Sequence, residues 1–355
     1  MLKKSILIIL FLSSIKIFSQ ETDSPNIIMM IGDGMGVTQV SSGMYSNNNY
    51  SSFERSDFVG LIKTHSADNL ITDSAAAGTA MSAGIKTNNK VVGMDKNFNP
   101  VKSILDIYME EGYSTAIVVT STIVHATPAS YFSSVKSRYD YEEIASQLAN
   151  SGINFFVGGG ERYFNDRYDS RDLKKEMKDY FFANSLESFK NSNSNKIGYL
   201  TAYDDPKEKH LGRKPSLIDL VKITIQKLKN LNKPFFLLVE GSQIDWGGHD
   251  NDSDHMISEM IEFDNTVNEV FNFSEENMNT LVVITADHET GGASIVSGNL
   301  SKSEVKVDYV SEDHSATMVP VFSFGPYSKN FKGVYDNTEI FDKLKAIIRK
   351  WKKYF

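Results

Sequence analysis

The sequence contains no cysteine among its 355 residues. This absence excludes thiol catalysis, zinc-thiolate sites and disulfides, so histidine and carboxylate side chains are the metal ligands that remain. Basic residues are also in deficit, since 37 Lys and Arg face 45 Asp and Glu and give a net charge of −8. An acidic chain of this kind is a poor general binder of nucleic acid. An anionic substrate must therefore be attracted locally, by metal ions or by a specific arginine.

Beyond the first 20 residues, no segment is long and apolar enough to predict a membrane span. The opening stretch, MLKKSILIILFLSSIKIFSQ, places two lysines before a short apolar run and small polar residues. This order predicts a secretory signal peptide over residues 1–19, with cleavage before Gln20. Its removal would take away Lys3, Lys4 and Lys16 and lower the net charge to −11. We therefore expect a periplasmic or secreted protein.

Apolar runs of strand length alternate with helical patterns along the chain, and no internal repeat is present. This alternation predicts an α/β fold with a mainly parallel sheet. Residues 161–213 differ from the rest because they are rich in charge, Asn and Ser. We interpret them as an insertion or a lid over the main sheet.

Three of the apolar runs end in a carboxylate: "IIMMIGD" in Asp33, "FFLLVE" in Glu240 and "LVVITADH" in Asp287. Ligands of open α/β sheets bind beyond the carboxyl ends of the strands. A single Asp at such a place is an ordinary turn former. Three buried carboxylates at one edge need cations to coexist, so the set predicts a metal site.

Histidines supply further candidate ligands. Asp245 and His249 are four residues apart, so one helical turn would point both side chains the same way. Imidazole and carboxylate both suit Zn²⁺, and two such Asp/His pairs can hold two metals with an open position for substrate. The second pair is Asp287 and His288, and His314 is an additional candidate, whereas His65, His210 and His255 are interpreted as ordinary surface histidines.

The stretch "ITDSAAAGTAMSAG", residues 71–84, predicts a helix capped by Asp73 or Ser74. Its small residues favour close packing. A second interpretation places Ser74 at a helix N-terminus, where backbone N–H groups favour anions such as phosphate. The stretch alone favours the first interpretation.

The ordered motifs resemble those of the alkaline phosphatases, which are metal-dependent phosphomonoesterases. The motifs run from about residue 25 to about residue 326 and are "NIIMMIGDGMG", "TDSAAAGTAMSAGIKTNNKVVGMD", "HATPAS", "SRYDY", "PSL", "FFLLVEGSQIDWGGH", "TADHETGG" and "DHSATMVPVFSFGP". The resemblance implies a three-layer sandwich with helices on both sides of the sheet, and a single catalytic domain over residues 20–355. It also implies hydrolysis of phosphate monoesters through a phosphoserine intermediate, releasing inorganic phosphate and an alcohol.

The resemblance also implies a role for each matching residue. Ser74 corresponds to the nucleophile, and Arg138 corresponds to the arginine that grips the phosphoryl oxygens, a task for a planar bidentate donor. The implied cofactors are two Zn²⁺ and one Mg²⁺ per chain. One zinc is held by Asp245, His249 and His314, the second by Asp33, Asp287, His288 and the Ser74 oxygen, and Mg²⁺ by Asp33, Thr127 and Glu240.

Two positions depart from the best-known bacterial enzyme of the family. His125, two residues before Thr127, stands where that enzyme has Asp. Because imidazole favours a softer ion, the third site could take Zn²⁺ in place of Mg²⁺. Trp246 stands where it has Lys, and we expect either packing at the rim or a stacking surface for an aromatic leaving group. Monomers and homodimers both occur in the family, so a homodimer stays open.

Other functions remain as alternatives. A sulfatase needs a Cys or Ser in a C/S-x-P-x-R setting, which "DSAAAG" lacks. Phosphodiesterases generally lack the third metal site, for which Thr127 and Glu240 are both present, and a metal-dependent mutase is a further possibility within the superfamily. A catalytically silent protein that binds zinc or phosphate would not need Ser74 and Arg138 beside complete ligand sets.

Overall fold

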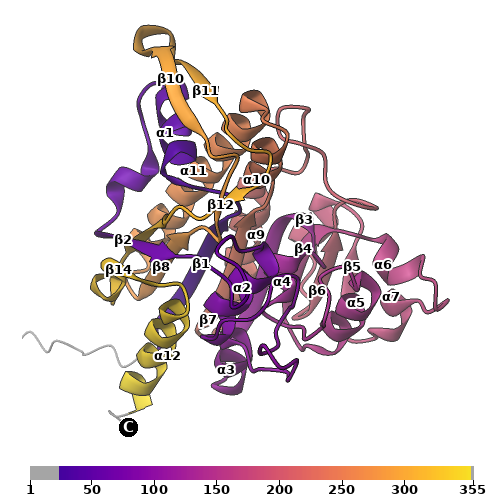
Figure 1. Ribbon diagram of the computed structural model, residues 1–355. Coiled ribbons are helices and arrows are strands. Elements are labelled where there is room, and N and C mark those ends of the chain that lie inside the picture. Colours follow the sequence, from indigo (N-terminus) through magenta and orange to yellow (C-terminus); the bar gives the residue numbers. More distant parts are fainter. Residues whose placement is uncertain (1–23, 353–355) are drawn as a thin grey trace, which may run out of the picture.

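The computed structural model describes residues 24–352, and its centre is a ten-stranded sheet (Figure 1). In this sheet β13 runs antiparallel to both of its neighbours, β2 and β8, and every other pairing is parallel. The mainly parallel sheet predicted from the sequence is therefore confirmed. The strand order is β14 (Gly333–Asp336), β2 (Phe58–Lys63), β13 (Val319–Phe324), β8 (Thr280–Thr285), β1 (Asn26–Gly32), β7 (Phe235–Gly241), β3 (Ser114–Thr122), β4 (Phe155–Gly159), β6 (Ile197–Leu200) and β5 (Phe181–Ala183).

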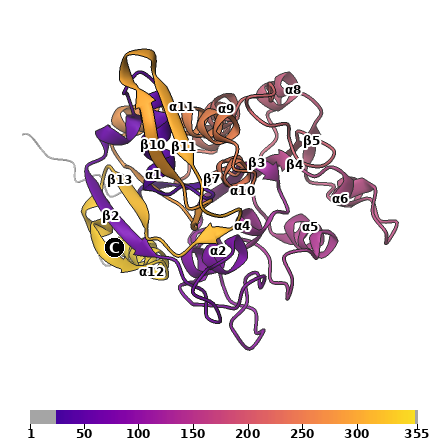
Figure 2. The ribbon, with the colours of Figure 1, turned by 45° about the horizontal axis from the view of Figure 1, so that its top comes forward.

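Helices cover both faces of the sheet, which confirms the three-layer architecture (Figure 2). One face carries α9 (Leu217–Asn230) and α11 (Ser253–Glu276), with α1 (Val37–Ser46) and α10 (Gln243–His249) packed against α11. The other face carries α2 (Ser74–Ala83), α3 (Ile104–Glu110), α4 (Ala126–Ala129), α5 (Tyr141–Asn150) and α12 (Glu339–Lys352). Strands buried on both faces have no solvated side, so they are apolar throughout instead of alternating.

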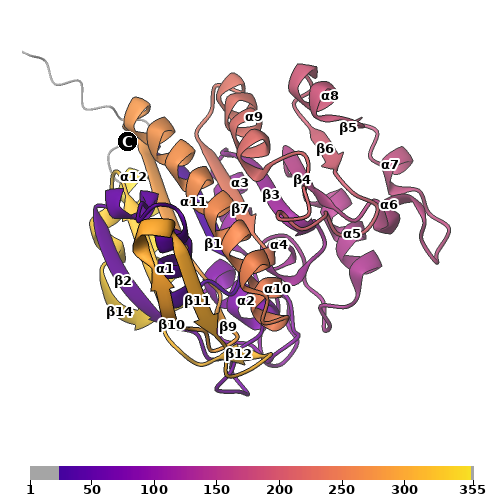
Figure 3. The ribbon, with the colours of Figure 1, turned by 90° about the horizontal axis from the view of Figure 1, so that it is seen from above.

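The register of the central strands brings their carboxyl ends to one edge. Ile31 of β1 pairs with Glu240 of β7 on one side and with Thr285 of β8 on the other. Asp33 and Asp287 each lie two residues beyond Ile31 and Thr285. Asp33 and Asp287 are therefore level with each other, and Glu240 lies two residues before that level on the adjacent strand, so all three carboxylates lie at one end of the sheet. Figure 3 shows α2 and α10 gathered at this end of the sheet.

Helix α2 packs as closely as its small residues predict. All ten of its residues are buried, and Asp73 caps its N-terminus by accepting a hydrogen bond from the backbone N–H of Ala76. A Cβ atom at Gly78 would lie 2.5 Å from Ser130 Oγ, so only glycine allows α2 to approach the segment that follows α4 this closely. Close packing and the placement of Ser74 at the helix start therefore occur together.

Residues 161–213 extend the sheet at its far edge. They contain α6 (Arg162–Asn165), α7 (Leu173–Glu176), β5, α8 (Leu186–Asn191) and β6. Strand β6 pairs with β4, and β5 pairs with β6. Two strands of this segment thus continue the main sheet, while a role as a lid stays a prediction.

Two small sheets complete the chain. The hairpin of β10 (Ser294–Asn299) and β11 (Glu304–Asp308) projects from the body (Figure 1). Strand β9 (Glu289–Thr290) pairs with β12 (His314–Ser315), and this pairing brings His314 beside Thr290. The short β9–β12 sheet therefore brings a distant histidine close to His288, which lies with Asp287 between β8 and β9.

Among residues 24–352, no helix combines the length and the apolar character that crossing a membrane requires. The signal peptide predicted over residues 1–19 lies outside the described residues, and it stays a prediction.

Candidate active site

The first group of potential metal ligands consists of Asp245, His249 and His314. Asp245 and His249 lie one turn apart on α10, and His249 Nε2 is 3.3 Å from Asp245 Oδ2. His314 arrives from β12 and places its Nε2 3.1 Å from His249 Nε2. Two imidazole nitrogens that face each other at this distance beside a carboxylate form a donor set suited to Zn²⁺.

A second group surrounds Ser74, the first residue of α2. His288 Nε2 lies 3.3 Å from Ser74 Oγ, 3.2 Å from Asp287 Oδ2 and 3.6 Å from Asp33 Oδ1. All four side chains are buried or nearly so. The structure thus brings the serine hydroxyl, two carboxylates and one imidazole to the same point, as the resemblance implies.

The third group joins Asp33 to His125 and Glu240, with one donor atom of each within 4.8 Å of the others. Asp33 is therefore shared between the second and third groups. Thr127 is buried on α4, two residues after His125. His125 is thus one of the potential ligands of the third group.

A shell of hydrogen bonds orients the histidines. His314 Nδ1 lies 2.8 Å from the carbonyl oxygen of Thr72, and His249 Nδ1 contacts the carbonyl of Glu312. Thr290 Oγ1 donates to Asp245 Oδ1 and lies 3.2 Å from His288 Nδ1. Contacts at Nδ1 leave each Nε2 directed into the site, which is how metal-ligating histidines are usually held. Thr290 is not among the predicted site residues, although it lies two residues after His288 in the "TADHETGG" motif.

Arg138 is tied to the start of α2 by Asp73, a residue that the sequence identified only as a helix cap. Arg138 Nη1 donates to Asp73 Oδ2 at 3.0 Å, and Arg138 Nη2 lies 3.4 Å from His125 Nε2. Asp73 also accepts from the backbone N–H of Lys90. Asp73 therefore accepts a hydrogen bond from Arg138 with Oδ2 and one from the first turn of α2 with Oδ1.

Burial and mutual repulsion control the charge of the carboxylates. Burial, reinforced by Asp287 and Asp245, raises the pKa of Asp33 well above its ordinary value. Burial likewise raises the pKa of Asp287, and it raises that of Glu240 to about 8. Carboxylates this close and this deeply buried ionise together only when cations compensate them. The electrostatics of the metal-free protein thus favour cation binding.

The histidine pKa values follow the same surroundings. Burial, with a contribution from Arg138, lowers the pKa of His125 to about 3, and burial lowers that of His288 well below its ordinary value. Both rings are therefore neutral, which is the form that binds metal. The hydrogen bond that His249 donates to Asp245 raises the pKa of His249 to about 9.

Several buried polar atoms of these groups have no hydrogen-bond partner in the described part of the chain. A buried polar atom without a hydrogen-bond partner destabilises the fold, so several such atoms at one place indicate that a bound ion supplies the missing partner. The unpartnered atoms are Asp33 Oδ1, Asp33 Oδ2, Asp287 Oδ2, Glu240 Oε1, Thr127 Oγ1 and His125 Nδ1. Oxygen and imidazole donors that converge without partners fit bound divalent cations.

Trp246 lies beside the third group, and two histidines that were interpreted as surface residues lie apart from these groups. Trp246 is partly exposed, and its ring stands edge-on to that of His125 with the centroids 6.3 Å apart. His65 is half-exposed and pairs with Asp336. The interpretation of His255 as a surface residue is wrong, because it is 2% exposed in the first turn of α11.

Comparisons with known proteins identify the family of this chain. The family model for alkaline phosphatase matches residues 24–305. Alkaline phosphatase 4 of Bacillus subtilis (strain 168) is 32% identical over 88% of this chain and 86% of its own length. The structure of alkaline phosphatase from the Antarctic bacterium TAB5 has 37% identity and a TM-score of 0.87, covering 92% of this chain and 98% of that chain. A mutant of the same enzyme, with Mg bound in the M3 site, has 36% identity and a TM-score of 0.87, covering 92% and 99%.

The fold and the clustered potential ligands define a metal-binding hydrolase with a mainly parallel α/β sandwich. The chain belongs to the alkaline phosphatase family, and it is a phosphomonoester hydrolase.

Proposed function

We propose that this chain is an exported alkaline phosphatase that hydrolyses phosphate monoesters through a phosphoserine intermediate at a two-zinc, one-magnesium centre. The observation that carries the proposal is the position of Ser74 Oγ, 3.3 Å from His288 Nε2 and beside the carboxylates of Asp33 and Asp287. A serine placed among metal ligands at a helix N-terminus is positioned to attack a bound phosphoryl group.

The unpartnered donor atoms support the ligand sets that the resemblance implies. When bound, the metal ions supply positive charge that favours the serine alkoxide, neutralises the phosphoryl oxygens and stabilises the leaving oxygen. Asp245, His249 and His314 would hold one Zn²⁺; Asp33, Asp287, His288 and Ser74 the other; and Asp33, Thr127 and Glu240 the Mg²⁺.

The chain's own residues orient and perform the transfer. Ser74 Oγ attacks phosphorus in line and forms the phosphoserine, while the P–O bond to the alcohol breaks and the alcohol leaves with a proton. Arg138 holds the phosphoryl oxygens with charge-assisted hydrogen bonds. Water then attacks phosphoserine from the side that the alcohol has left, which releases phosphate and restores Ser74. Two inversions give net retention at phosphorus.

The identity of the third metal depends on His125. Imidazole suits Zn²⁺ better than Mg²⁺, which prefers oxygen ligands. His125 Nδ1 is buried and has no hydrogen-bond partner among residues 24–352, and His125 groups with Asp33 and Glu240. A TAB5 alkaline phosphatase mutant, in which Glu replaces a histidine, has Mg bound in the M3 site, which supports Mg²⁺ at a carboxylate-rich site of this family. We propose Mg²⁺ at this site, with Zn²⁺ as its competitor.

Location, assembly and substrate range rest on the sequence. The predicted signal peptide supports a periplasmic or secreted enzyme, and a homodimer is kept as a proposal. Trp246, part-exposed beside His125, supports either rim packing or stacking against an aromatic leaving group.

The deciding experiment compares p-nitrophenyl phosphate with bis(p-nitrophenyl) phosphate. We expect the monoester to be hydrolysed far faster, EDTA to abolish its turnover, and Zn²⁺ with Mg²⁺ to restore it. A faster reaction with the diester would favour a phosphodiesterase. Full activity in rigorously metal-free protein would contradict the proposed centre.

A further inference from the structure

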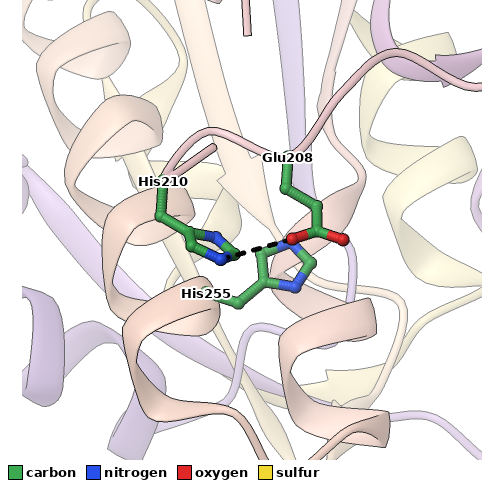
Figure 4. A group of neighbouring side chains, drawn as sticks. All are labelled: Glu208, His210 and His255. Atoms are coloured by element: carbon green, nitrogen blue, oxygen red, sulfur yellow. Dashed lines mark ion pairs between the residues drawn. The ribbon is translucent and has the colours of Figure 1, made fainter. Parts of the chain in front are cut away.

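A fourth group of potential metal ligands lies outside the active site. It consists of Glu208, His210 and His255, with one donor atom of each within 4.8 Å of the others. Figure 4 shows the carboxylate and the two imidazole rings converging, from a loop and from the helix beneath it. Glu208 and His210 belong to the loop between β6 and α9, and His255 belongs to α11. The group shares no residue with the three groups around Ser74.

His255 carries an unsatisfied buried nitrogen. Its side chain is 3% exposed, and Nε2 has no hydrogen-bond partner in the described residues. The nearest carboxylate oxygen, Glu259 Oε1, is 3.7 Å away, which is too long for a hydrogen bond. That oxygen already accepts from the Lys209 backbone N–H and from Arg213 Nη1, each at 2.8 Å. A buried imidazole nitrogen left in this state needs another partner.

The other two residues are placed to provide that partner through a metal ion. His210 Nε2 and Glu208 Oε2 are 3.4 Å apart, and the His210 and His255 rings have their centroids 5.2 Å apart. Two ligand atoms on a tetrahedral Zn²⁺ at bond lengths of about 2.0–2.1 Å are separated by about 3.4 Å. The carboxylate and the first imidazole thus already stand at the spacing of a zinc site.

The loop is fastened to α11 by contacts that do not involve the three ligands. Lys209 Nζ donates to Glu262 Oε1 at 2.6 Å, and Arg213 makes a bidentate pair with Glu259. Gln243 Nε2 of α10 donates to the carbonyl of Pro206. These contacts hold the residues on either side of Lys209 over His255 before any metal binds. Pre-organisation of this kind reduces the entropic cost of binding.

We propose that Glu208, His210 and His255 form a peripheral binding site for a divalent transition metal, with Zn²⁺ as the best match. Two imidazoles and one carboxylate are a zinc donor set, and a water completes four-coordination. The bound ion satisfies His255 Nε2 and pins the 206–213 loop to the first turn of α11. Its role is structural, because no serine or arginine of the catalytic group belongs to it. The proposal does not rest on the proposed function.

Zinc counting by elemental analysis tests the proposal. The mature protein and its variants are dialysed against one Zn²⁺ buffer of fixed free concentration, and bound zinc per chain is measured. We expect Glu208→Gln/His210→Gln, which alters loop side chains, and His255→Gln each to bind about one Zn²⁺ per chain fewer than wild type. His65→Gln is the matched control, because His65 pairs with a carboxylate outside any ligand group, and it should keep the wild-type count.

A second measurement separates this site from the active site. At saturating Zn²⁺ and Mg²⁺, the Glu208→Gln/His210→Gln variant should retain wild-type kcat/KM for p-nitrophenyl phosphate, while the increase in its thermal midpoint on adding Zn²⁺ should be smaller. An unchanged zinc count in this variant would overturn the proposal, because Glu208 and His210 would then form only an ion pair with each other. A lost zinc accompanied by lost phosphatase activity would overturn the separation of the two sites.

Discussion

Arg138 Nη1 donates to Asp73 Oδ2 at 3.0 Å, while Asp73 Oδ1 accepts from the N–H of Ala76 in the first turn of the helix that Ser74 begins. Asp73 therefore connects Arg138 to the start of the helix that carries Ser74 through two hydrogen bonds. Both partners of the ion pair are largely buried, so solvent screens their attraction weakly. This relationship predicts that two different substitutions will disturb phosphate binding to different extents.

Arg138→Ala should weaken binding of inorganic phosphate and lower kcat/KM by about 10- to 100-fold, since hydrogen bonds to charged groups contribute about 1.5–3 kcal/mol. Asp73→Ala keeps the guanidinium but leaves it unanchored, so the loss should be smaller. It should also destabilise the fold by about 1 kcal/mol through the lost cap. Steady-state kinetics, phosphate inhibition and denaturant unfolding measure these effects. An unaltered phosphate inhibition constant in Arg138→Ala would remove Arg138 from the site.

Ser74→Ala should abolish the phosphoenzyme while leaving the fold and metal content nearly intact. Mass spectrometry of protein quenched at low pH with substrate present detects the covalent phosphate. Ser41→Ala is a suitable control, because Ser41 lies on α1 and its hydroxyl donates to the carbonyl of Val37 in the same helix. Slow residual turnover is expected, because positioning and electrostatics survive the loss of a nucleophile. Covalent phosphate in Ser74→Ala would mean that another residue is the nucleophile.

The sequence predicted the fold well because its signals are local. Strand-length apolar runs, the Ala-rich helix and the carboxylates at strand ends each follow from a few adjacent residues. The register of β1 with β7 and β8 then places Asp33, Glu240 and Asp287 together, as expected for parallel strands. The grouping of His314 with Asp245 depends on the β9–β12 pairing, a contact between segments far apart in sequence. It was reached only through the family resemblance.

Residues whose roles depend on tertiary contacts were not predicted. Thr290 bridges Asp245 and His288, although threonine carries no signal of such a role on its own. His255 was misplaced because the polar segment "DNDSDHMISEM" looks like a solvated helix start. The structure buries His255 beneath the loop that carries Lys209. Glu259 and Glu262, which lie on α11 like His255, accept hydrogen bonds from Lys209 and hold this loop in place. Burial by a distant loop cannot be read from helix periodicity.

Glu240→Ala should empty the third metal site. Glu240 is fully buried at the end of β7, and its loss would leave the shared carboxylate of Asp33 without that cation. The fall in kcat should exceed that of Arg138→Ala, and added Mg²⁺ should not restore activity because the missing ligand belongs to the protein. Elemental analysis beside kinetics measures both effects. Third-metal occupancy equal to wild type would refute the role of Glu240, and with it the main argument against a phosphodiesterase.

The pKa of Glu240 also predicts how the stability of the metal-free protein depends on pH. Burial raises this pKa to about 8 in the folded protein, from about 4.3 in an unfolded chain. The folded state therefore holds a proton that the unfolded chain has released, and the free energy of unfolding falls as pH rises through this range. His249 acts in the same direction, because its pKa is raised to about 9, and its stabilising contribution is lost as pH rises through that value.

The window for the measurement begins above about pH 6.5, the ordinary value for histidine. Below it, His125 and His288 act in the opposite direction, because their lowered pKa values make the folded state release protons. We expect the thermal midpoint of the metal-free protein to decrease as the pH is raised from about 6.5 to about 9. The slope of the midpoint against pH is set by the number of protons released on unfolding. Glu240→Gln should make the slope shallower. Saturating Zn²⁺ and Mg²⁺ should remove it, because bound metals keep the carboxylates ionised and compensated. A midpoint that rises with pH in metal-free protein would contradict the charge state assigned to Glu240.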